Sequence, residues 1–515
     1  MLVSDATSAR PTERSGGSTV AHQHVDVLII GAGLSGIGAA CHLQRELPGR
    51  TYRILEARDA VGGTWDLFRY PGIRSDSDMF TLGYSFRPWG GPRSIADGGS
   101  ILRYIEETAR EHGVTDHIRY GRRVTALAWD SGQARWTAEV SCADTGGTET
   151  LTAAFVYACT GYYRYDEGYT PEFAGADRFR GRIVHPQHWP EDLDPSGKRF
   201  VVIGSGATAV TLVPALAEDA AHVTMLQRSP SYVTSLPDRD AVADLVRRLL
   251  PAERAYAIVR WKNVLVTSAF FQLSRRVPAL VKRILRWRLE RQLPADFDLD
   301  THFTPRYDPW DQRLCLVPNN DLFRALRAGR ASMVTDHIDT FTEEGIALTS
   351  GASLEADVIV TATGLNLLTM GGIELTVDGE AVDVSDTVAY KGMMLSGVPN
   401  FAFAIGYTNA SWTLKVDLVS TYLCRLLQHM DAHGYDHVMP LRPSDGEPLR
   451  PLIDLTSGYV TRSLDQLPKQ AHRAPWQLHQ NYVRDVRLFR GGALDDEGVR
   501  FGRALTASRR TDRVA

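Results

Sequence analysis

The chain has 515 residues, of which 43% are hydrophobic and 23% charged, and its formal net charge is −4 at pH 7. This length allows more than one domain with a sizeable core, and the nearly balanced charge argues against a nucleic-acid partner. No apolar run approaches the roughly 18 residues that a membrane-spanning helix requires.

The five cysteines lie far apart and include no C-x-x-C pair, so the sequence indicates neither a structural zinc site nor a dithiol redox centre. The H-E-x-x-H motif is also missing, and we expect no catalytic metal. This cysteine usage fits a reducing cytoplasm. Residues 1–22 are rich in Ser, Thr, Gly and Arg and lack the apolar centre of a signal peptide, which predicts a disordered tail.

A first nucleotide-binding pattern begins with a buried parallel strand, predicted over residues 25–30. The sequence G-A-G-L-S-G follows directly and opens a helical pattern. In such a loop Gly31 permits the tight turn, Gly33 lets the backbone approach a pyrophosphate, and Gly36 lets the helix pack close to the strand. The N-terminus of the helix, where Ser35 lies, offers unpaired N–H groups to the anion.

A second strand is predicted over residues 52–55, and it ends in Glu56. This carboxylate lies about 20 residues after the last glycine of the loop, where an acidic side chain binds ribose hydroxyls. Strand, glycines, helix and terminal acid together predict a dinucleotide site. The alternative is a glycine-rich turn without a ligand.

A glycine-rich loop follows at residues 62–65 and continues to Y-P-G-I-R-S-D at residues 70–76. At every specified position this segment resembles a signature of type I Baeyer–Villiger monooxygenases, [A/G]-G-x-W-x(4)-[F/Y]-P-[G/M]-x(3)-D. The resemblance implies FAD as the first ligand and Asp76 near the flavin, where it would orient a catalytic arginine. The alternative for Asp76 is a solvated side chain in a polar loop. The remaining FAD contacts expected here are Gly63, Thr64, Trp65, Arg74 and Ser75.

Two paired strands are predicted at residues 123–129 and 136–140, around a turn at Gly132. The resemblance implies that Val124 contacts the adenine of FAD. Residues 155–161 are similar to the element that closes the nucleotide domains of flavoproteins.

Residues 179–190 lie between the two glycine-rich patterns of the chain and read F-R-G-R-I-V-H-P-Q-H-W-P. The pattern F-x-G-x(3)-H-x(3)-W-P resembles the fingerprint of the same family. In flavin-containing N/S-monooxygenases another aromatic usually replaces the tryptophan. The resemblance implies that this segment couples cofactor binding to domain rotation and performs no chemistry itself. The alternative is a surface loop that simply packs. The matching residues are Phe179, Gly181, His185, Trp189 and Pro190.

A second nucleotide-binding pattern consists of a strand at residues 198–203 and the sequence G-S-G-A-T-A, in which Ala209 is an allowed third position. The next strand, at residues 222–226, is followed by Arg228 instead of a carboxylate. A guanidinium at this position suits a 2′-phosphate, so we expect NADPH rather than NADH. The alternative is a solvated arginine at a strand end. The expected contacts are Gly204, Gly206, Ala207, Thr208, Arg228 and Ser229.

Residues 238–299 are helical in period, interrupted by prolines, and strongly basic. A membrane-surface helix has this composition, and so does a helical insertion that covers an active site, which the family has at this position. We favour the insertion, with loose contact to an anionic membrane as an addition.

Residues 302–318 resemble the segment that carries the essential arginine of the family, and Arg313 matches that arginine. The alternative is an arginine in a structural ion pair. Residues 357–364 form a second closing element. Residues 65–69, 309–313 and 462–482 resemble the ethionamide-activating subgroup, and the likeness to the family extends over about residues 24–490.

The expected fold class is α/β, with two Rossmann-like dinucleotide-binding domains for FAD and NADPH and a helical insertion. We expect residues 1–22 to be a tail and residues 23–165 and 385–515 to form the FAD domain. The NADP domain is expected at residues 166–235 and 318–384, and the insertion at residues 236–317.

The family chemistry implied is the reduction of FAD by NADPH and formation of a C4a-peroxide with O₂, followed by attack on a ketone to give an ester or lactone. Arg313 would stabilise the peroxyanion and the developing oxyanion, and Asp76 would hold Arg313. Bound nicotinamide would shield the site from water.

Three alternatives stay open for the function. One is a flavin N/S-monooxygenase, whose sulfoxidation is also a side activity that we expect here. The second is an NADPH-dependent flavoprotein reductase of the disulfide type, which needs a cysteine pair where only Cys41 occurs. The third is a non-catalytic, membrane-associated module. We expect a cytoplasmic enzyme, peripherally associated with a membrane; the ketone and the oligomeric state cannot be predicted.

Overall fold

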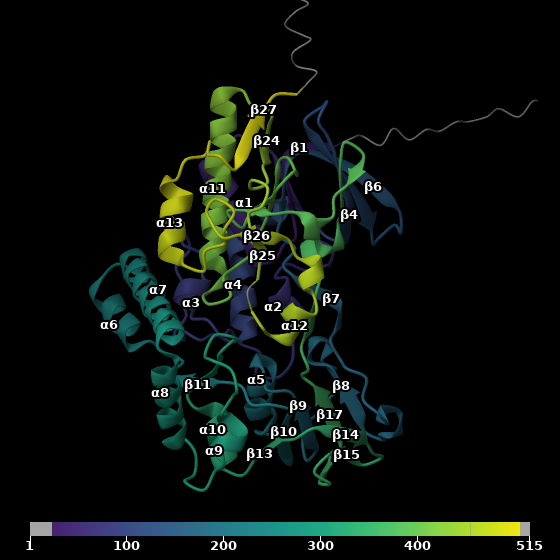
Figure 1. Cartoon of the computed structure of the whole chain (residues 1–515), viewed down its shortest axis with the longest axis vertical. Helices are drawn as coiled ribbons and strands as arrows, with labels where there is room; N and C mark the ends of the chain where they lie inside the picture. The colour runs from purple at the N-terminus through teal and green to yellow at the C-terminus, as the bar shows by residue number, and fades with distance from the viewer. Residues whose placement is uncertain (1–22, 454, 505–515) are drawn as a thin grey trace, which may run out of the picture.

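The computed structural model describes residues 23–453 and 455–504 (Figure 1). The predicted tail, residues 1–22, lies outside the described residues. Two sheets, each with helices packed against it, form the upper and lower parts of the molecule in Figure 1. The α/β fold class predicted from the sequence is therefore confirmed.

The first sheet is built around β1 (Gln23–Ile30), which pairs in parallel with β2 (Tyr52–Leu55) on one side and β6 (Thr148–Ala158) on the other. Val27 and Ile29 point to one hydrophobic cluster, and Leu28 and Ile30 to the opposite one. This alternation buries both faces of the strand. The sheet also contains β3 (Ile118–Arg119), β4 (Arg122–Asp130), β5 (Arg135–Cys142), β19 (Glu374–Val377), β20 (Glu380–Ala381), β21 (Ala389–Tyr390), β22 (Met394–Leu395) and β23 (Phe401–Phe403).

Helix α1 (Leu34–Glu46) packs against the long helix α11 (Trp412–His433) on one face of this sheet. Helix α4 (Gly98–Glu111) contributes to the same layer, and α13 (Tyr482–Gly491) packs on the outside of α11. The C-cap of α11 is Gly434, which adopts the left-handed conformation with φ +64° that favours glycine.

The second sheet has the order β13-β10-β9-β17-β8, and all four pairings are parallel. Helices α5 (Ala207–Leu216) and α10 (Asp321–Arg327) pack on it. Its strands are β8 (Arg182–Val184), β9 (Arg199–Ile203), β10 (His222–Gln227), β13 (Ala331–Thr335) and β17 (Val358–Thr361), and a small antiparallel sheet of β14 (Ile338–Phe341), β15 (Gly345–Leu348) and β16 (Ser353–Glu355) follows β13.

The chain crosses between the two sheets twice. It leaves the first sheet through β7 (Tyr163–Gly168) and returns through β18 (Leu365–Leu367), and these two strands pair antiparallel with each other. After the return, β19 pairs in parallel with β4 of the first sheet. The chain therefore rejoins the first sheet before residue 384, which is where the sequence predicts the NADP domain to end. The division into domains stays a prediction.

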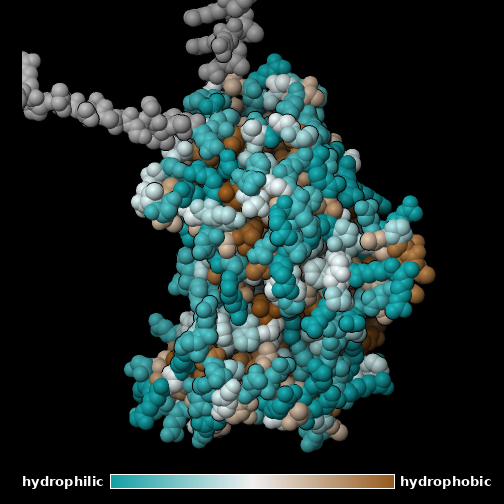
Figure 2. All heavy atoms as spheres, turned by 180° about the vertical axis from the view of Figure 1, so that it is seen from behind, coloured by the Kyte–Doolittle hydropathy of each residue, from teal (hydrophilic) through white to brown (hydrophobic). Residues whose placement is uncertain are grey.

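A helical segment emerges from the second sheet's side of the molecule, at the left edge of Figure 1. It begins after β11 (Val233–Leu236) and ends before β12 (Cys315–Pro318), and these two strands pair in parallel. Figure 2 shows hydrophobic side chains gathered on this edge of the molecule. The helices of the segment are α6 (Ala241–Leu249), α7 (Ala252–Arg276), α8 (Pro278–Glu290) and α9 (Leu299–Phe303).

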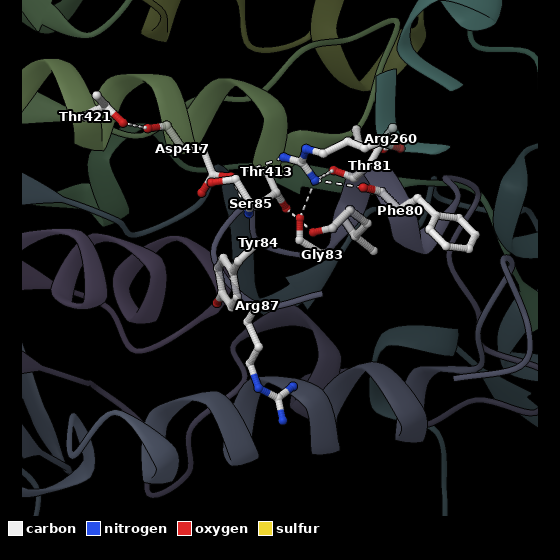
Figure 3. A network of polar contacts seen from close by, with 12 residues as sticks. Phe80, Thr81, Gly83, Tyr84, Ser85, Arg87, Arg260, Thr413, Asp417 and Thr421 are labelled. Carbon is white, nitrogen blue, oxygen red and sulfur yellow. Dashed lines mark hydrogen bonds and ion pairs between the residues drawn. The ribbon is translucent and has the colours of Figure 1, made fainter. Parts of the chain in front are cut away.

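Helix α7 is anchored to the first sheet's helical layer by Arg260, which is 6% exposed (Figure 3). Its guanidinium donates to the carbonyl oxygens of Phe80, Thr81 and Gly83, at 2.8, 3.3 and 2.6 Å. It also forms an ion pair of 3.1 Å with Asp417 in α11. Buried charge is tolerated when every donor has such a partner.

The remaining elements are short and lie mostly in the C-terminal part. They are α2 (Thr64–Leu67), α3 (Met79–Leu82), α12 (Gly458–Thr461), β24 (His437–Pro440), β25 (Leu449–Pro451), β26 (Lys469–Ala471) and β27 (Val499–Gly502), with single 3₁₀ turns at Thr115–His117, Ala176–Arg178, Pro186–His188, Thr369–Gly372, Val384–Asp386 and Leu464–Gln466. Across residues 23–453 and 455–504, no helix combines the length and the hydropathy needed to cross a lipid bilayer.

Candidate active site

One large cavity of about 1550 Å³ is lined by residues of both sheets. It opens where β1 and β2 end in the first sheet and where β9 and β10 end in the second, which is where ligands bind in open α/β sheets. Every catalytic or cofactor-binding residue predicted from the sequence lines this cavity except Gly36. The five fingerprint residues lie outside it.

Two positions of the first glycine-rich loop have no room for a side chain. Gly31 has φ +102°, and a Cβ there would lie 2.6 Å from the carbonyl oxygen of Cys159. A Cβ at Gly36 would lie only 1.9 Å from the carbonyl oxygen of Gly31, so the helix can approach the strand only with glycine at this position. Gly33 is the N-cap of α1, and no side chain caps the helix there. Its N–H groups are therefore available to an anion.

Glu56 follows β2 and is 6% exposed. One carboxylate oxygen accepts a hydrogen bond of 2.7 Å from the backbone N–H of Ala32, and the other accepts one of 2.9 Å from that of Arg58. Glu56 thus holds the glycine-rich loop in place while it lines the cavity. Its contact with a ribose stays a prediction.

The second glycine loop lies directly against the first. The backbone N–H of Gly62 donates to the carbonyl oxygen of Ala32 at 3.0 Å, and a Cβ at Gly63 would lie 3.1 Å from the Cα of Gly33. Two bare backbones therefore form one wall of the cavity. A flat polar wall beside an uncapped helix N-terminus fits the pyrophosphate of a dinucleotide such as FAD. Thr64 lies next to this wall, where its hydroxyl is 3.0 Å from that of Tyr165.

Asp76 and Arg313 meet in the cavity, with 2.9 Å between a carboxylate oxygen and Nη2. Their side chains are 31% and 34% exposed, so the pair faces the cavity instead of being enclosed. The Asp76 carboxylate raises the pKa of Arg313 above its ordinary value. The guanidinium therefore remains charged and can stabilise a negative oxygen placed beside it.

Tyrosine side chains that the sequence did not reveal line the cavity together with this pair. They are Tyr162, Tyr163 and Tyr459. Tyr162 stacks on Trp412 with 5.2 Å between ring centroids, and the indole Nε1 of Trp412 donates to Ser35 Oγ at 2.8 Å. This chain of contacts connects the first glycine-rich loop with the region of Arg313. Tyrosines scattered over the sequence carry no local pattern that could have identified them.

The second nucleotide loop repeats the geometry of the first. Gly204 has φ +140°, and a Cβ there would lie 2.3 Å from the carbonyl oxygen of Ala362. Gly206 is the uncapped N-cap of α5, and Ala209 is fully buried at the third position of the pattern. Ala207 and Thr208 follow on the cavity wall.

Arg228 and Ser229 follow β10 on the same side of the cavity. Within residues 23–453 and 455–504, the exposed guanidinium of Arg228 makes no ion pair, and it is available for an anionic ligand. The backbone oxygen of Ser229 accepts a hydrogen bond of 3.2 Å from Ser205 Oγ.

Three further predicted residues have other structural contacts. Arg74 forms an ion pair of 2.6 Å with Asp321 of α10, which joins the two halves of the molecule. Ser75 accepts a hydrogen bond of 2.9 Å from the backbone N–H of Ser77. Val124 is 5% exposed and lines the cavity beside the first sheet.

The fingerprint segment lies at the two crossings between the sheets. His185 Nε2 donates to the carbonyl oxygen of Gly364 at 3.1 Å, and Nδ1 accepts from the backbone N–H of Gln187 at 3.2 Å. This pair of roles requires a neutral imidazole, and burial lowers the pKa of His185. A Cβ at Gly168 would lie 1.9 Å from the His185 ring, so β7 and the residue before β18 both contact this imidazole.

Three of the other fingerprint residues, Phe179, Gly181 and Trp189, are closely packed, and their role in coupling cofactor binding to domain rotation stays a prediction. Phe179 is 9% exposed and packs edge-to-face on Phe341, with 6.5 Å between centroids. A Cβ at Gly181 would lie 2.3 Å from a backbone oxygen. Trp189 packs against the core of the second sheet, and Pro190 follows it as a partly exposed residue.

Comparisons with family models, with known proteins and with solved structures each find monooxygenases among the matches. The model of the family described as "Flavin-binding monooxygenase-like" matches residues 94–370, and a model of the "NAD(P)-binding Rossmann-like domain" matches residues 29–88. FAD-containing monooxygenase EthA of Mycobacterium tuberculosis (strain ATCC 25618 / H37Rv) is 56% identical over 482 residues, which cover 93% of this chain and 98% of that protein.

EthA of Mycolicibacterium smegmatis is 55% identical over 480 residues, or 93% of this chain and 97% of that protein. Among solved structures, an oxidized steroid monooxygenase bound to NADP has a TM-score of 0.70 and 25% identity, and the alignment covers 93% of this chain and 100% of that one.

Proposed function

Since this chain belongs to the family of flavin-binding monooxygenases, as one of the EthA-like FAD-containing enzymes, we propose that it is a Baeyer–Villiger monooxygenase. It uses FAD and NADPH to insert one oxygen atom of O₂ into a ketone, which gives an ester or lactone. The observation that carries this proposal is the pair of Arg313 and Asp76, which faces a cavity shared by two dinucleotide-binding loops.

FAD fits the first loop and NADPH the second. The bare wall of Gly33 and Gly63 and the uncapped N-terminus of α1 support a pyrophosphate there. Arg228, free of carboxylate partners in the described chain, supports a 2′-phosphate at the second loop. When bound, reduced FAD supplies the activation of oxygen, and the protein supplies position and electrostatics.

Arg313 performs the electrostatic part of the catalysis. Its guanidinium keeps its charge beside Asp76 and faces the cavity, so it can stabilise negative charge that develops on an oxygen. Asp76 fixes the direction of the guanidinium. The stacked rings of Tyr162 and Trp412 give the cavity that they share with Arg313 an aromatic lining.

The reductase alternative needs reactive thiols, and the cysteines do not offer them. All five are buried and free of disulfides. Burial raises the pKa of Cys41 and of Cys315 to about 12, which keeps both protonated and unreactive near neutral pH.

Product analysis tests the proposal directly. The protein is incubated with FAD, NADPH, ¹⁸O₂ and a panel of linear, cyclic and aryl ketones plus one thioether. An ester or lactone that carries one labelled atom supports the proposal. Sulfoxide as the sole product would favour an N/S-monooxygenase, and NADPH consumption with only peroxide released would favour an oxidase or a reductase.

The partners in this proposal are a small ketone and O₂. We also propose that the enzyme acts in the cytoplasm and makes loose contact with a membrane surface through the helical segment at residues 236–317.

A further inference from the structure

Exposed apolar side chains are concentrated in one part of the molecule (Figure 2). Among the described residues, every exposed large aliphatic or tryptophan side chain except Ile183 falls between Leu236 and Trp287. Scattered exposed apolar residues need no explanation, but a continuous cluster marks a surface that binds something.

The exposed residues form a stripe on each of three helices. On α6 they are Val242, Leu245 and Leu249; on α7 they include Ile258, Trp261, Leu265 and Leu273; on α8 they are Leu280, Ile284 and Trp287. The members of each stripe recur mostly at intervals of three or four residues, which is the spacing of one helical face. On α8 the opposite face, with Val281, Leu285 and Leu289, is buried. Helix α8 is therefore apolar on two faces, only one of which packs on the protein.

Positive charge accompanies the stripes. Several basic residues of these helices are neutralised, such as Arg275 by Asp311 and Lys282 by Asp308. Five further arginines are exposed and make no ion pair within residues 23–453 and 455–504: Arg248, Arg254, Arg276, Arg283 and Arg291. The surface thus combines exposed apolar stripes with guanidinium groups that lack counter-charges.

We propose that α6, α7 and α8 bind the surface of a membrane rich in anionic lipid, an inference that rests on the localisation proposed above. The apolar stripes enter the boundary between headgroups and acyl chains, and the five arginines contact lipid phosphates. Arginine suits this role because its planar guanidinium donates two parallel hydrogen bonds to phosphate.

A second copy of this chain fits the surface less well. A two-fold interface brings the same patch of both subunits together. Arginines without counter-charges would then face arginines, at a cost that lipid phosphates do not impose.

The surface is held in place before it meets a membrane. Arg260 lies on α7 between Ile258 and Trp261, and its guanidinium is bonded to three backbone oxygens and to Asp417 (Figure 3). Helix α7 therefore presents its exposed stripe without having to fold upon binding, which lowers the entropic cost of association.

Vesicle binding tests the inference with the full-length FAD-loaded protein. Co-sedimentation with vesicles of phosphatidylcholine containing phosphatidylglycerol should exceed that with pure phosphatidylcholine and should fall as salt is raised. Arg248→Gln, Arg276→Gln and Arg283→Gln together should weaken binding by about fivefold for each charge removed. Arg324→Gln with Arg327→Gln, two exposed changes on α10, should leave binding unchanged.

A second pair of variants tests the apolar contribution. Leu249→Glu with Val266→Glu changes side chains that are 71% and 62% exposed, so folding should be unaffected while vesicle binding is lost. Ile183→Glu, at the exposed apolar residue outside the segment, is the matched control and should bind like the wild type.

Two results would overturn the inference. One is equal binding of the wild type and the Leu249/Val266 variant to anionic vesicles. The other is a concentration-dependent dimer without lipid that the same variant abolishes, because the surface would then bind a second copy. Labelled-oxygen product formation by the same preparations reports the oxygenation chemistry independently, so a failure of membrane binding and a failure of the proposed function are distinguishable.

Discussion

Arg313→Ala should abolish ester formation while leaving the reduction of bound FAD by NADPH largely intact. In the structure the guanidinium faces the cavity and is held by Asp76 at 2.9 Å, where it can stabilise an oxyanion. Hydride transfer from NADPH creates no oxyanion, so this first half of the reaction does not need Arg313.

The magnitude follows from the kind of interaction that is lost. Removal of one preorganised donor from a developing oxyanion costs roughly 10²- to 10³-fold in kcat, or about 3–4 kcal/mol, and a charged donor lies at the upper end. The effect on folding should be small. Both side chains of the pair are about one-third exposed, so solvent screens the ion pair and its loss should change the free energy of unfolding by less than about 1 kcal/mol.

Rapid-mixing spectroscopy measures flavin reduction by NADPH, and gas chromatography measures the ester formed from a ketone that the wild type accepts. Arg313→Lys should restore part of the ester yield, because a lysine keeps the charge but lacks the fork of donors. Arg324→Ala, an exposed change on α10, controls for surface charge. Equal ester yield in Arg313→Ala and the wild type would refute the role of Arg313, and a parallel loss of flavin reduction would show that the residue acts on cofactor binding.

Three further changes test other parts of the site. Arg228→Gln should raise KM for NADPH about ten- to a hundredfold, as expected for a lost charge-assisted hydrogen bond of about 1.5–3 kcal/mol, and should leave KM for NADH unchanged; steady-state kinetics with both cofactors would contradict this if both constants rose together. Gly36→Ala places a Cβ 1.9 Å from the carbonyl oxygen of Gly31 and should reduce the FAD content of the purified protein. A Cβ at Gly206 meets no protein atom within 4 Å, so Gly206→Ala should keep its FAD and lose affinity for NADPH. Normal FAD content in Gly36→Ala would argue against the close approach of helix and strand. Burial lowers the pKa of His185 from its ordinary value of 6.5, so the unfolded chain binds a proton at this residue first as pH falls, and the free energy of unfolding decreases below about pH 6.5. In urea unfolding between pH 7.5 and 5.5, the stability of His185→Gln should therefore depend less on pH than that of the wild type. An unchanged pH dependence would exclude His185 as its source.

The parts of the site that the sequence predicts are those with local patterns. Gly31, Gly33 and Glu56 belong to one strand–loop–helix–strand unit, in which the spacing along the chain determines the position in space. The same holds for Gly204 and Gly206 in the second sheet. Hydrophobic periodicity and glycine spacing are therefore sufficient to predict the fold class and the positions of both nucleotide-binding loops.

Long-range contacts could not be read in this way. The proximity of Asp76 and Arg313 was expected only from the resemblance to a family, since nothing in either segment refers to the other. Tyr162 and Tyr459 reach the same pair from distant segments and were not foreseen. The strand at Glu374–Val377 joins the first sheet earlier than expected, because its pairing with β4 depends on tertiary structure and not on local propensity.

The basic helical segment shows a similar limit. Its composition indicated either an insertion or a membrane-surface helix, and contact with a membrane stays a prediction. The sequence pattern does not show which arginines of the segment are exposed without an ion pair, or that Arg260 is buried, because both depend on tertiary packing.

The anchoring of α7 also limits how the helical segment could be exchanged between related enzymes. The guanidinium of Arg260 is held by the backbone oxygens of Phe80, Thr81 and Gly83, by the hydroxyl of Tyr256 and by the carboxylate of Asp417. The segment leaves β11 after Leu236 and re-enters β12 at Cys315, which pairs with Val233 at the other end of β11. A chimera that exchanges residues 238–300 would have to conserve Arg260 with Asp417. It would also have to conserve the pairs of Arg275 with Asp311 and of Lys282 with Asp308, because each of these ion pairs crosses the boundary of the exchanged segment.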